Sequence, residues 1–185
     1  MKISRAQAQA NRARVVAAAA ELFRARGFEG VSVGELMAAA GFTHGGFYNH
    51  FGSKEALAAE ALTGAWDEMA GERAKARDLG ELLDGYLSAA ARGAPGKSCP
   101  AAALAGEVAR ATPAVRQAFA DGLEGMVGEV EAGLSGESPE GRERAVALVA
   151  AMVGALMLSR AVPDGHPLAS ELLSATRRQA KKALL

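Results

Sequence analysis

Cysteine and strand-forming patterns are what this sequence most clearly lacks. Cys99 is the single cysteine among 185 residues, so no internal disulfide can form, and a reducing cytoplasm is the simplest location. Aromatic residues make up only 5% of the chain, Thr and Ile are scarce, and no alternation of apolar and polar residues is long enough to indicate a strand. These absences argue against a β-sheet and against a disulfide framework.

Long hydrophobic runs are also missing. A membrane-spanning helix needs roughly 18 uncharged apolar residues, and the most apolar stretch, residues 145–158, is shorter than that and flanked by arginines. Residues 1–14 are polar and basic with no apolar run beside them, so they do not resemble a secretory signal. We therefore expect a cytoplasmic protein with no membrane association.

The net charge is zero, but the charges are unevenly distributed. Residues 1–54 carry seven basic and three acidic residues, which leaves 14 of the 21 basic and 18 of the 21 acidic residues for the rest of the chain. A basic N-terminal part joined to an acidic body is typical of a phosphate-binding module attached to another domain. Such asymmetry also arises by chance, so charge alone does not decide the function.

Alanine, leucine, glutamate and arginine are abundant and favour helix throughout. Glycine and proline then mark where helices end and begin. Together they predict an all-α protein with nine helices, over residues 8–26, 32–40, 43–50, 54–77, 79–92, 100–111, 113–134, 138–162 and 168 to nearly the end.

The segment from Ser32 to Lys54 carries the functional signal. Ser32 and Glu35 form a capping box, Gly41 allows a sharp turn, and Thr43 is a good N-cap for a second short helix. Two capped short helices across a tight turn are typical of a helix-turn-helix, whose second helix enters the DNA major groove.

The second of these helices has one face for the core and one for DNA. Phe47 and Phe51 lie four residues apart and supply the buried face. The outward positions are His44, Gly45, Tyr48 and Asn49, with His50 near the edge. Asparagine can bond both edge groups of adenine, and tyrosine can bond a phosphate or pack on a thymine methyl. Lys54, at a helix N-terminus, suits a phosphate.

The same residues resemble a known family. Residues 12–57 are similar to the tetracycline-repressor (TetR/AcrR) family of bacterial regulators, through Ala40-Gly41-Phe42-Thr43 and Phe47-Tyr48-Asn49-His50-Phe51-Gly52-Ser53-Lys54-Glu55. The resemblance implies a homodimer of nine-helix chains, with a helix-turn-helix DNA-binding domain at residues 1–53 and a ligand-binding and dimerisation domain at residues 54–185. The last two long helices would pair with those of the second copy.

Carried over position by position, the resemblance also implies DNA contacts. Phosphates would be touched by Ser32 and Thr43, unless these two residues serve only as caps. The base edges would be faced by His44 and Gly45. The DNA backbone would be contacted by Tyr48, His50 and Lys54. Two positions depart from the usual pattern, because Asn49 stands where a basic or aromatic residue is common and Met37 where a small residue is usual.

A regulator of this kind needs an input, and the body offers two candidates. Apolar and aromatic residues at helical spacing either line an effector pocket or form plain core; they are Trp66, Met69, Tyr86, Phe119, Met126 and Met152. If they line a pocket, its ligand is largely apolar, with Tyr86 or Trp66 as the polar handle.

Cys99 is the second candidate input. It follows Lys97 and directly precedes Pro100, where a helix begins, so the helix dipole and a nearby ammonium both favour the thiolate. Such a thiol senses oxidants or electrophiles by forming a sulfenic acid or an adduct. The alternative is a small buried apolar residue.

We predict a repressor that binds a palindromic operator as a homodimer and is released by a small apolar ligand or by modification of Cys99. An activator uses the same DNA-binding domain, so the sign of regulation stays open. The alternatives are a helical-bundle enzyme and an adaptor that binds no DNA. The sequence offers little for an enzyme, because His44, His50 and His166 lack metal-ligand spacing, and we expect no metal, cofactor or catalytic residue.

Overall fold

The computed structural model describes residues 4–134, 139–182 and 184, and within these residues every regular element is helical. This confirms the predicted all-α class. The α-helices are α1 (Arg5–Arg26), α2 (Val33–Ala39), α3 (Lys54–Arg73), α4 (Leu79–Tyr86), α5 (Ala89–Gly93), α6 (Pro100–Val108), α7 (Pro113–Gly133), α8 (Pro139–Ala161) and α9 (Pro167–Lys182). The 3₁₀ helices are η1 (His44–Asn49) and η2 (Pro95–Lys97).

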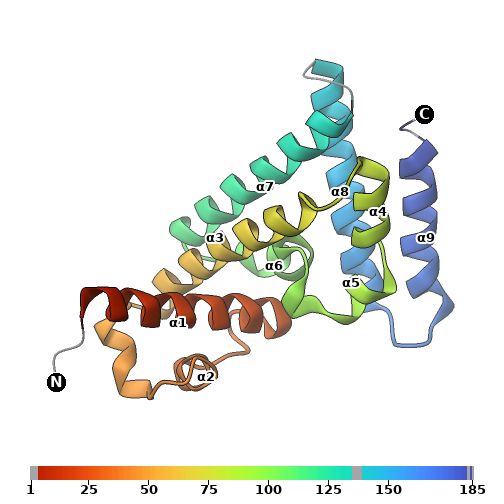
Figure 1. The fold of residues 1–185 in the computed structure, drawn as a ribbon. Coiled ribbons are helices and arrows are strands. Elements are labelled where there is room, and N and C mark those ends of the chain that lie inside the picture. The colour runs from red at the N-terminus through yellow and green to blue at the C-terminus, as the bar shows by residue number, and fades with distance from the viewer. Residues whose placement is uncertain (1–3, 135–138, 183, 185) are drawn as a thin grey trace.

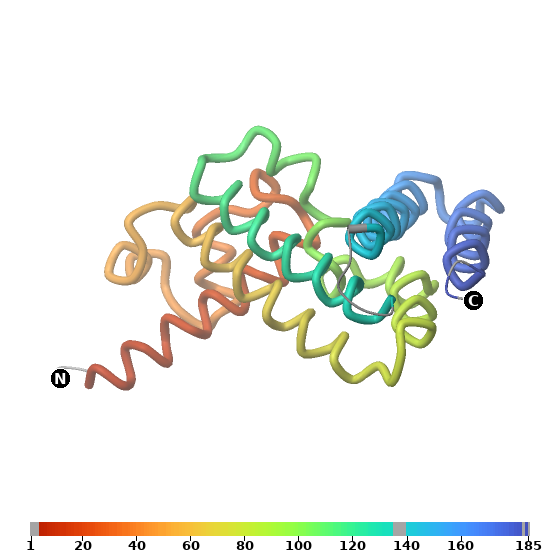
Figure 2. Tube along the Cα trace, turned by 90° about the horizontal axis from the view of Figure 1, so that it is seen from above, coloured from red at the N-terminus to blue at the C-terminus, as the bar shows by residue number. Residues whose placement is uncertain are grey.

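The helices form a small N-terminal head at one end of the molecule and a larger body at the other. We call α1, α2 and η1 the head, and the helices from α3 onward the body. Helix α1 lies across the base with α2 below it, while α3 and α7 rise from it along each other (Figure 1). Helices α8 and α9 pack together on the side away from the head (Figure 2).

One hydrophobic core joins the head to the body. It includes Val15 and Phe23 of α1, Leu57 of α3 and Leu104 of α6, each at most 2% exposed. Burying a side chain of this size contributes about 1.5–3 kcal/mol to folding. Since these residues share one core, the orientation of the head is set by the packing of α1 against α3 and α6.

The helix boundaries differ from prediction where side chains compete with the helical backbone. The predicted helix over residues 79–92 is divided into α4 and α5, because the Ser88 hydroxyl accepts a hydrogen bond from Ala91 N at 3.0 Å and caps a new helix. Helix α1 begins three residues earlier than predicted, since the Ser4 hydroxyl caps it through Gln7 N at 3.1 Å. The predicted cap at Ser138 lies outside the described residues.

Helix α8 contains the most apolar stretch of the chain, residues 145–158. Residues 140–161 are long and apolar enough to pass as a membrane-spanning helix by length and composition alone. The helix passes only with the charged residues near its ends included, because its uncharged run lies between Arg144 and Arg160. In the fold, α8 packs against α6, α7 and α9.

Candidate nucleic-acid interface and body pocket

The first helix of the predicted turn motif is fixed by a complete capping box. The Ser32 hydroxyl accepts from Glu35 N at 3.3 Å, and the Glu35 carboxylate accepts from Ser32 N at 2.9 Å and from the Ser32 hydroxyl at 2.7 Å. These bonds and Arg26 lower the pKa of Glu35 to about 2. The box therefore stabilises α2 at neutral pH and loses this contribution as the pH falls toward 2.

The second helix of the motif is a 3₁₀ helix, η1, rather than the expected α-helix. Thr43 occupies the N-cap position with extended backbone, but its side chain makes no capping hydrogen bond, which corrects the predicted cap. Two consecutive glycines, Gly45 and Gly46, weaken the α-helical preference here. A Cβ on Gly46 would lie 3.4 Å from Met37 Cε, so this glycine leaves room for the large residue in α2.

The outer face of η1 is exposed as predicted. Phe47 and Phe51 are buried, at 0% and 3% exposure, whereas Tyr48 is 70% exposed. The Tyr48 ring meets the Phe47 ring edge-on at 5.2 Å, so the core holds its direction. The other predicted contact positions are exposed at Thr43, His44, Gly45 and Asn49, and partly buried at His50.

Residues from separate elements share this surface. A Cβ on Gly34 would lie 3.8 Å from His44 Nδ1 and 3.9 Å from Ser32 Oγ, which places the start of α2 beside the start of η1. Lys54 is the first residue of α3, directly after the Ser53 cap. The fold thus brings Ser32 close to His44, whereas Lys54 lines a hollow together with Glu29, Glu107 and Arg110.

Most arginines of the head hold the motif in place. Arg12 donates to His50 O at 3.3 Å, pairs with Glu60, and lies over the Phe51 ring at 4.6 Å. Arg14 donates to Ala40 O at 2.9 Å. These internal roles were not visible in the charge count, because sequence alone does not show which cations have partners.

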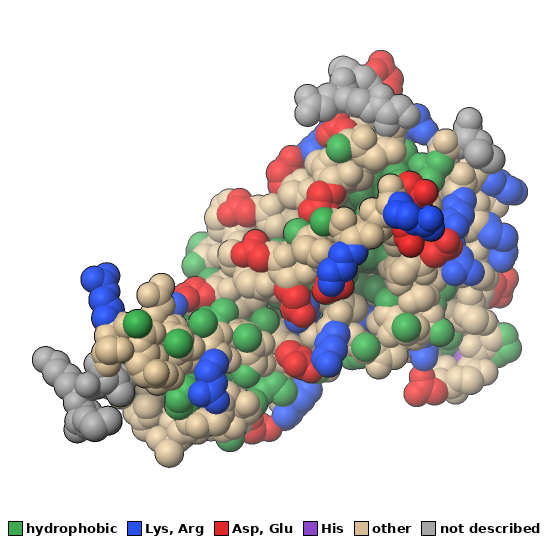
Figure 3. All heavy atoms as spheres, viewed as in Figure 1, with side chains coloured by type: hydrophobic (Ala, Val, Ile, Leu, Met, Phe, Trp, Pro, Cys, Tyr) green, Lys and Arg blue, Asp and Glu red, His purple; other side chains and the backbone are tan. Residues whose placement is uncertain are grey.

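Acidic side chains spread along α3 and α7 on the face seen in Figure 3.

The C-terminal end of α1 is joined to the body at Gly27. Gly27 has φ 79° and ψ 167°, a backbone region open almost only to glycine. The Glu107 carboxylate of α6 accepts a hydrogen bond from Phe28 N at 2.7 Å, and a Cβ on Gly27 would lie 2.2 Å from Glu107 Oε1. Neither residue stood out in the sequence analysis as a link between the two parts.

We expect Gly27→Ala to lower the free energy of unfolding by about 1–3 kcal/mol, because alanine is strained at this φ and displaces Glu107. The matched control is Gly125→Ala in α7, where a Cβ meets no atom within 4 Å. Alanine there should be neutral or stabilising by up to about 1 kcal/mol. Urea denaturation of both variants checks the opposite signs, and equal stability of the two would contradict this account of the joint.

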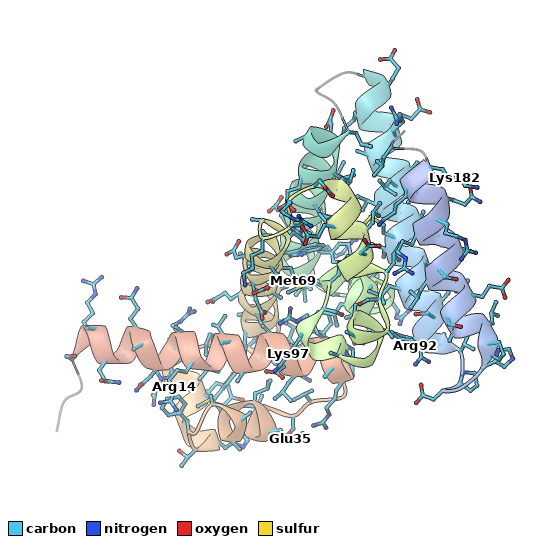
Figure 4. The ribbon with its side chains drawn as sticks, turned by 45° about the vertical axis from the view of Figure 1, so that its right-hand side comes forward. Arg14, Glu35, Met69, Arg92, Lys97 and Lys182 are labelled. Atoms are coloured by element: carbon cyan, nitrogen blue, oxygen red, sulfur yellow. The ribbon has the colours of Figure 1, made fainter. Side chains whose placement is uncertain are left out.

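The body contains a pocket of about 470 Å³ between α3, α4, α5 and the residues that precede α6. It lies between Met69 on α3 and Lys97 beside the C-terminal end of α1 (Figure 4). Three of the predicted input residues line it, Met69, Tyr86 and Cys99. Its size falls within the range of small-molecule sites.

The other predicted pocket residues lie in the core around this cavity. Trp66 and Phe119 pack on each other with ring centroids 5.9 Å apart, and the Trp66 indole covers Gly122 closely. Met126 is fully buried, with its Sδ 4.0 Å from Cys99 Sγ, and Met152 is fully buried on α8. The structure thus places only part of the predicted set at the pocket wall.

Helix α8 leaves an apolar face uncovered. Val146, Met157 and Leu158 are 47%, 38% and 56% exposed. Between Val146 and Ala161 all exposed residues of α8 are Ala, Val, Met or Leu. We call this surface the α8 face. On α9, Leu168 is 42% exposed.

Comparisons with known proteins agree with this arrangement. Residues 15–61 match the family described as bacterial regulatory proteins, tetR family. Residues 76–170, more than half of the chain, match the family described as transcriptional regulator LmrA/YxaF-like, C-terminal domain. The HTH-type transcriptional regulator YdgC of Bacillus subtilis is 47% identical over 53 residues, which cover 29% of this chain and 27% of that relative.

Solved structures share the fold over nearly the whole chain. A TetR-family regulator from Cytophaga hutchinsonii is 17% identical with a TM-score of 0.79, covering 100% of this chain and 96% of its own. A TetR regulator from Chloroflexus aurantiacus is 26% identical with a TM-score of 0.75, and the match covers 95% of this chain and 96% of that regulator. The reduced form of NemR from E. coli is 22% identical with a TM-score of 0.75, and the match covers 93% of this chain and 95% of NemR.

Proposed function

This chain belongs to the TetR family of bacterial transcriptional regulators, and from that premise we propose that it is a cytoplasmic repressor that binds a palindromic operator as a homodimer. The observation that carries the proposal is the outer face of η1. There Tyr48 is 70% exposed while Phe47 beneath it is fully buried. A large aromatic residue that is exposed to solvent on a helix-turn-helix is placed to meet DNA.

Selection from random double-stranded DNA tests the operator proposal. The protein should enrich one sequence with two-fold symmetry, whose half-sites are separated by about one helical turn, 34–36 Å, or a multiple of it. Enrichment of no sequence would favour the adaptor alternative. Enrichment of a single asymmetric half-site would contradict the dimer.

A second copy of the chain is the proposed partner of the α8 face. A monomeric soluble protein rarely leaves a large contiguous apolar surface in water. Helix α8 lies on the side of the body away from the head, so pairing through the α8 face would leave both heads free (Figures 1 and 2). Leu168 of α9, the other helix of the expected four-helix interface, is also exposed.

Helix α6 is the proposed link between the pocket and the head. Its N-terminal end follows Ser98, whose carbonyl accepts from the buried Arg24 of α1 at 3.3 Å. Its C-terminal end carries Glu107, which accepts from Phe28 N at 2.7 Å. A ligand that shifts α6 therefore moves both attachments of the head. A shift in population worth about 3 kcal/mol weakens operator binding more than a hundredfold.

The effector enters, in this proposal, the pocket lined by Met69, Tyr86 and Cys99. The lining is mostly apolar, which favours an apolar ligand that modifies packing around α6. Modification of Cys99 is the second proposed route of release. Cys99 is 3% exposed and occupies the N-cap position of α6, so an adduct on its sulfur displaces the start of that helix.

We expect hydrogen peroxide to release the wild-type protein from its operator and to leave Cys99→Ser bound. Serine is close in size to cysteine and makes neither a sulfenic acid nor a thiol adduct. The measurement is fluorescence anisotropy of labelled operator, with and without oxidant, followed by reduction. Equal release of both proteins would contradict the role of Cys99 and leave the pocket ligand as the sole input.

A further inference from the structure

A cation directly behind the pocket lining has no acidic partner. Arg160 of α8 donates from Nε to Arg92 O at 3.3 Å, and from Nη2 to Ala91 O at 2.7 Å and to the Ser98 hydroxyl. All three acceptors are uncharged. Its Nη1 is buried without a hydrogen-bond partner, and Arg160 makes no ion pair within the described part of the chain. A partly buried charge of this kind costs stability unless something compensates it.

Two cations at the pocket have no ion pair within the described residues, Lys97, which is exposed, and Arg160, which is partly buried. The other charged residues there are paired. Arg73, which lines the pocket, pairs with Glu129 at 2.5 Å. Glu72, also at the pocket, pairs with Lys75 at 2.6 Å. Arg92 pairs with Asp164 at 2.8 Å. The local balance therefore leaves positive charge uncompensated, and Arg160 carries the part of it that is shielded from water.

The Tyr86 hydroxyl, near Arg160, is a second buried donor without a hydrogen-bond partner. The Cys99 thiol beside it is only a weak partner. Burial raises the pKa of Tyr86 well above its usual value, and the charge of Arg160 partly offsets the rise. The phenol thus stays a neutral donor at physiological pH, within electrostatic range of the guanidinium.

One of the two donors lines the cavity and the other lies directly behind its lining. Tyr86, Ser98 and Cys99 line the pocket of about 470 Å³ together with Met69, Leu82 and Leu156. Arg160 is one turn beyond Leu156 on α8, and it contacts the lining residues Ala91 and Ser98. An occupant beside Tyr86 and Ser98 therefore lies next to the two unsatisfied donors, and it meets the apolar side chains elsewhere in the lining.

We infer that this pocket binds an amphipathic carboxylate, whose anionic group lies between Arg160 Nη1 and the Tyr86 hydroxyl and whose apolar chain packs on Met69, Leu82 and Leu156. A carboxylate accepts from both donors and neutralises the buried charge, which a neutral apolar ligand does not do. An ammonium ligand would add a second cation beside Arg160. The inference names the effector class for the pocket and rests on the proposed function only in treating that pocket as the effector site.

The test compares octanoate, octanol and octylamine by titration calorimetry with the purified full-length protein in the absence of DNA. Octanoate should bind at least about tenfold more tightly than octanol, because hydrogen bonds to a charged group contribute more than those to a neutral one. Octylamine should bind more weakly than octanol. Tyr86→Phe and Arg160→Met should each weaken octanoate binding about tenfold and leave octanol binding nearly unchanged.

Two variants keep the test decisive. Tyr86→Phe retains the ring and removes only the hydroxyl, so it reports on the inference even where Arg160→Met, which loses three hydrogen bonds, unfolds. Arg142→Met is the matched control, since Arg142 lies on the same helix and pairs with Glu124 at 2.7 Å away from the pocket. It should leave octanoate binding unchanged.

Octanol binding as tight as octanoate, no detectable octanoate binding, or full octanoate affinity in Tyr86→Phe would each overturn the inference. Failure of operator binding is a separate result, because the titration contains no DNA. A protein that binds octanoate but no operator would contradict the proposed function alone. One that binds an operator but prefers octanol would contradict only the carboxylate.

Discussion

Leu158→Asp is expected to convert the protein from a dimer into a monomer and to weaken binding to a two-fold symmetric operator at least about a hundredfold. Leu158 is 56% exposed on α8, so aspartate costs little in the folded monomer, but it places a charge within the apolar α8 face. In a dimer the second head is tethered close to the second half-site once the first head has bound. This high effective concentration raises the affinity for the whole operator about 10²–10⁴-fold. Analytical ultracentrifugation and anisotropy with labelled operator measure the two effects.

Ala120→Asp is the matched control for this variant. Ala120 is exposed on α7, a different helix from the one that carries the α8 face, so the same change there should leave the mass and the operator affinity unchanged. A Leu158→Asp protein that sediments as a dimer would show that the α8 face is not the interface. A monomeric variant that binds the operator as tightly as the wild type would show that dimerisation is not needed for recognition.

Tyr48→Ala should weaken operator binding roughly 30- to 150-fold without changing stability. One hydrogen bond from the phenol to DNA contributes about 1–1.5 kcal/mol, and a dimer loses two of them. Because Tyr48 is 70% exposed, the free energy of unfolding should change by less than about 0.5 kcal/mol. Anisotropy titrations and urea denaturation measure the two quantities.

Tyr48→Phe distinguishes the two proposed contacts of this residue. Loss equal to that of Tyr48→Ala indicates a hydrogen bond to phosphate, whereas near wild-type binding indicates packing on a thymine methyl. Lys75→Ala on the body is the control, since its only recorded ion pair is the exposed one with Glu72. Unchanged operator affinity in Tyr48→Ala would mean that η1 does not enter the DNA.

Local signals in the sequence were enough to predict most of the fold. The capping box of Ser32 and Glu35, the turn at Gly41 and the proline at the start of α7 all depend on neighbouring residues, and the structure has each of them. The prediction was wrong where two local preferences competed. Ser88 forms a helix cap within the expected helix, and the segment with the paired glycines Gly45 and Gly46 is a 3₁₀ helix.

The hydrogen bonds between residues far apart in the sequence could not be predicted. Phe28 and Glu107 are 79 residues apart, and Arg24 and Ser98 are 74 apart, so no pattern relates them. The exposed side of η1 was predictable, because the two phenylalanines four apart define its inner face. The unpaired charge at Arg160 had one weak signal in the sequence, an arginine separated from a long apolar run only by Ser159.

Binding to genomic DNA fragments, including the region upstream of the protein's own gene, tests the central proposal most directly when measured across a salt series. The proposal predicts tight binding by a dimer to a small subset of fragments, with an affinity that falls steeply as salt rises because phosphate contacts release counterions. Equal and weak binding to every fragment, or no binding at low salt, would contradict a sequence-selective regulator and leave the head as a structural module.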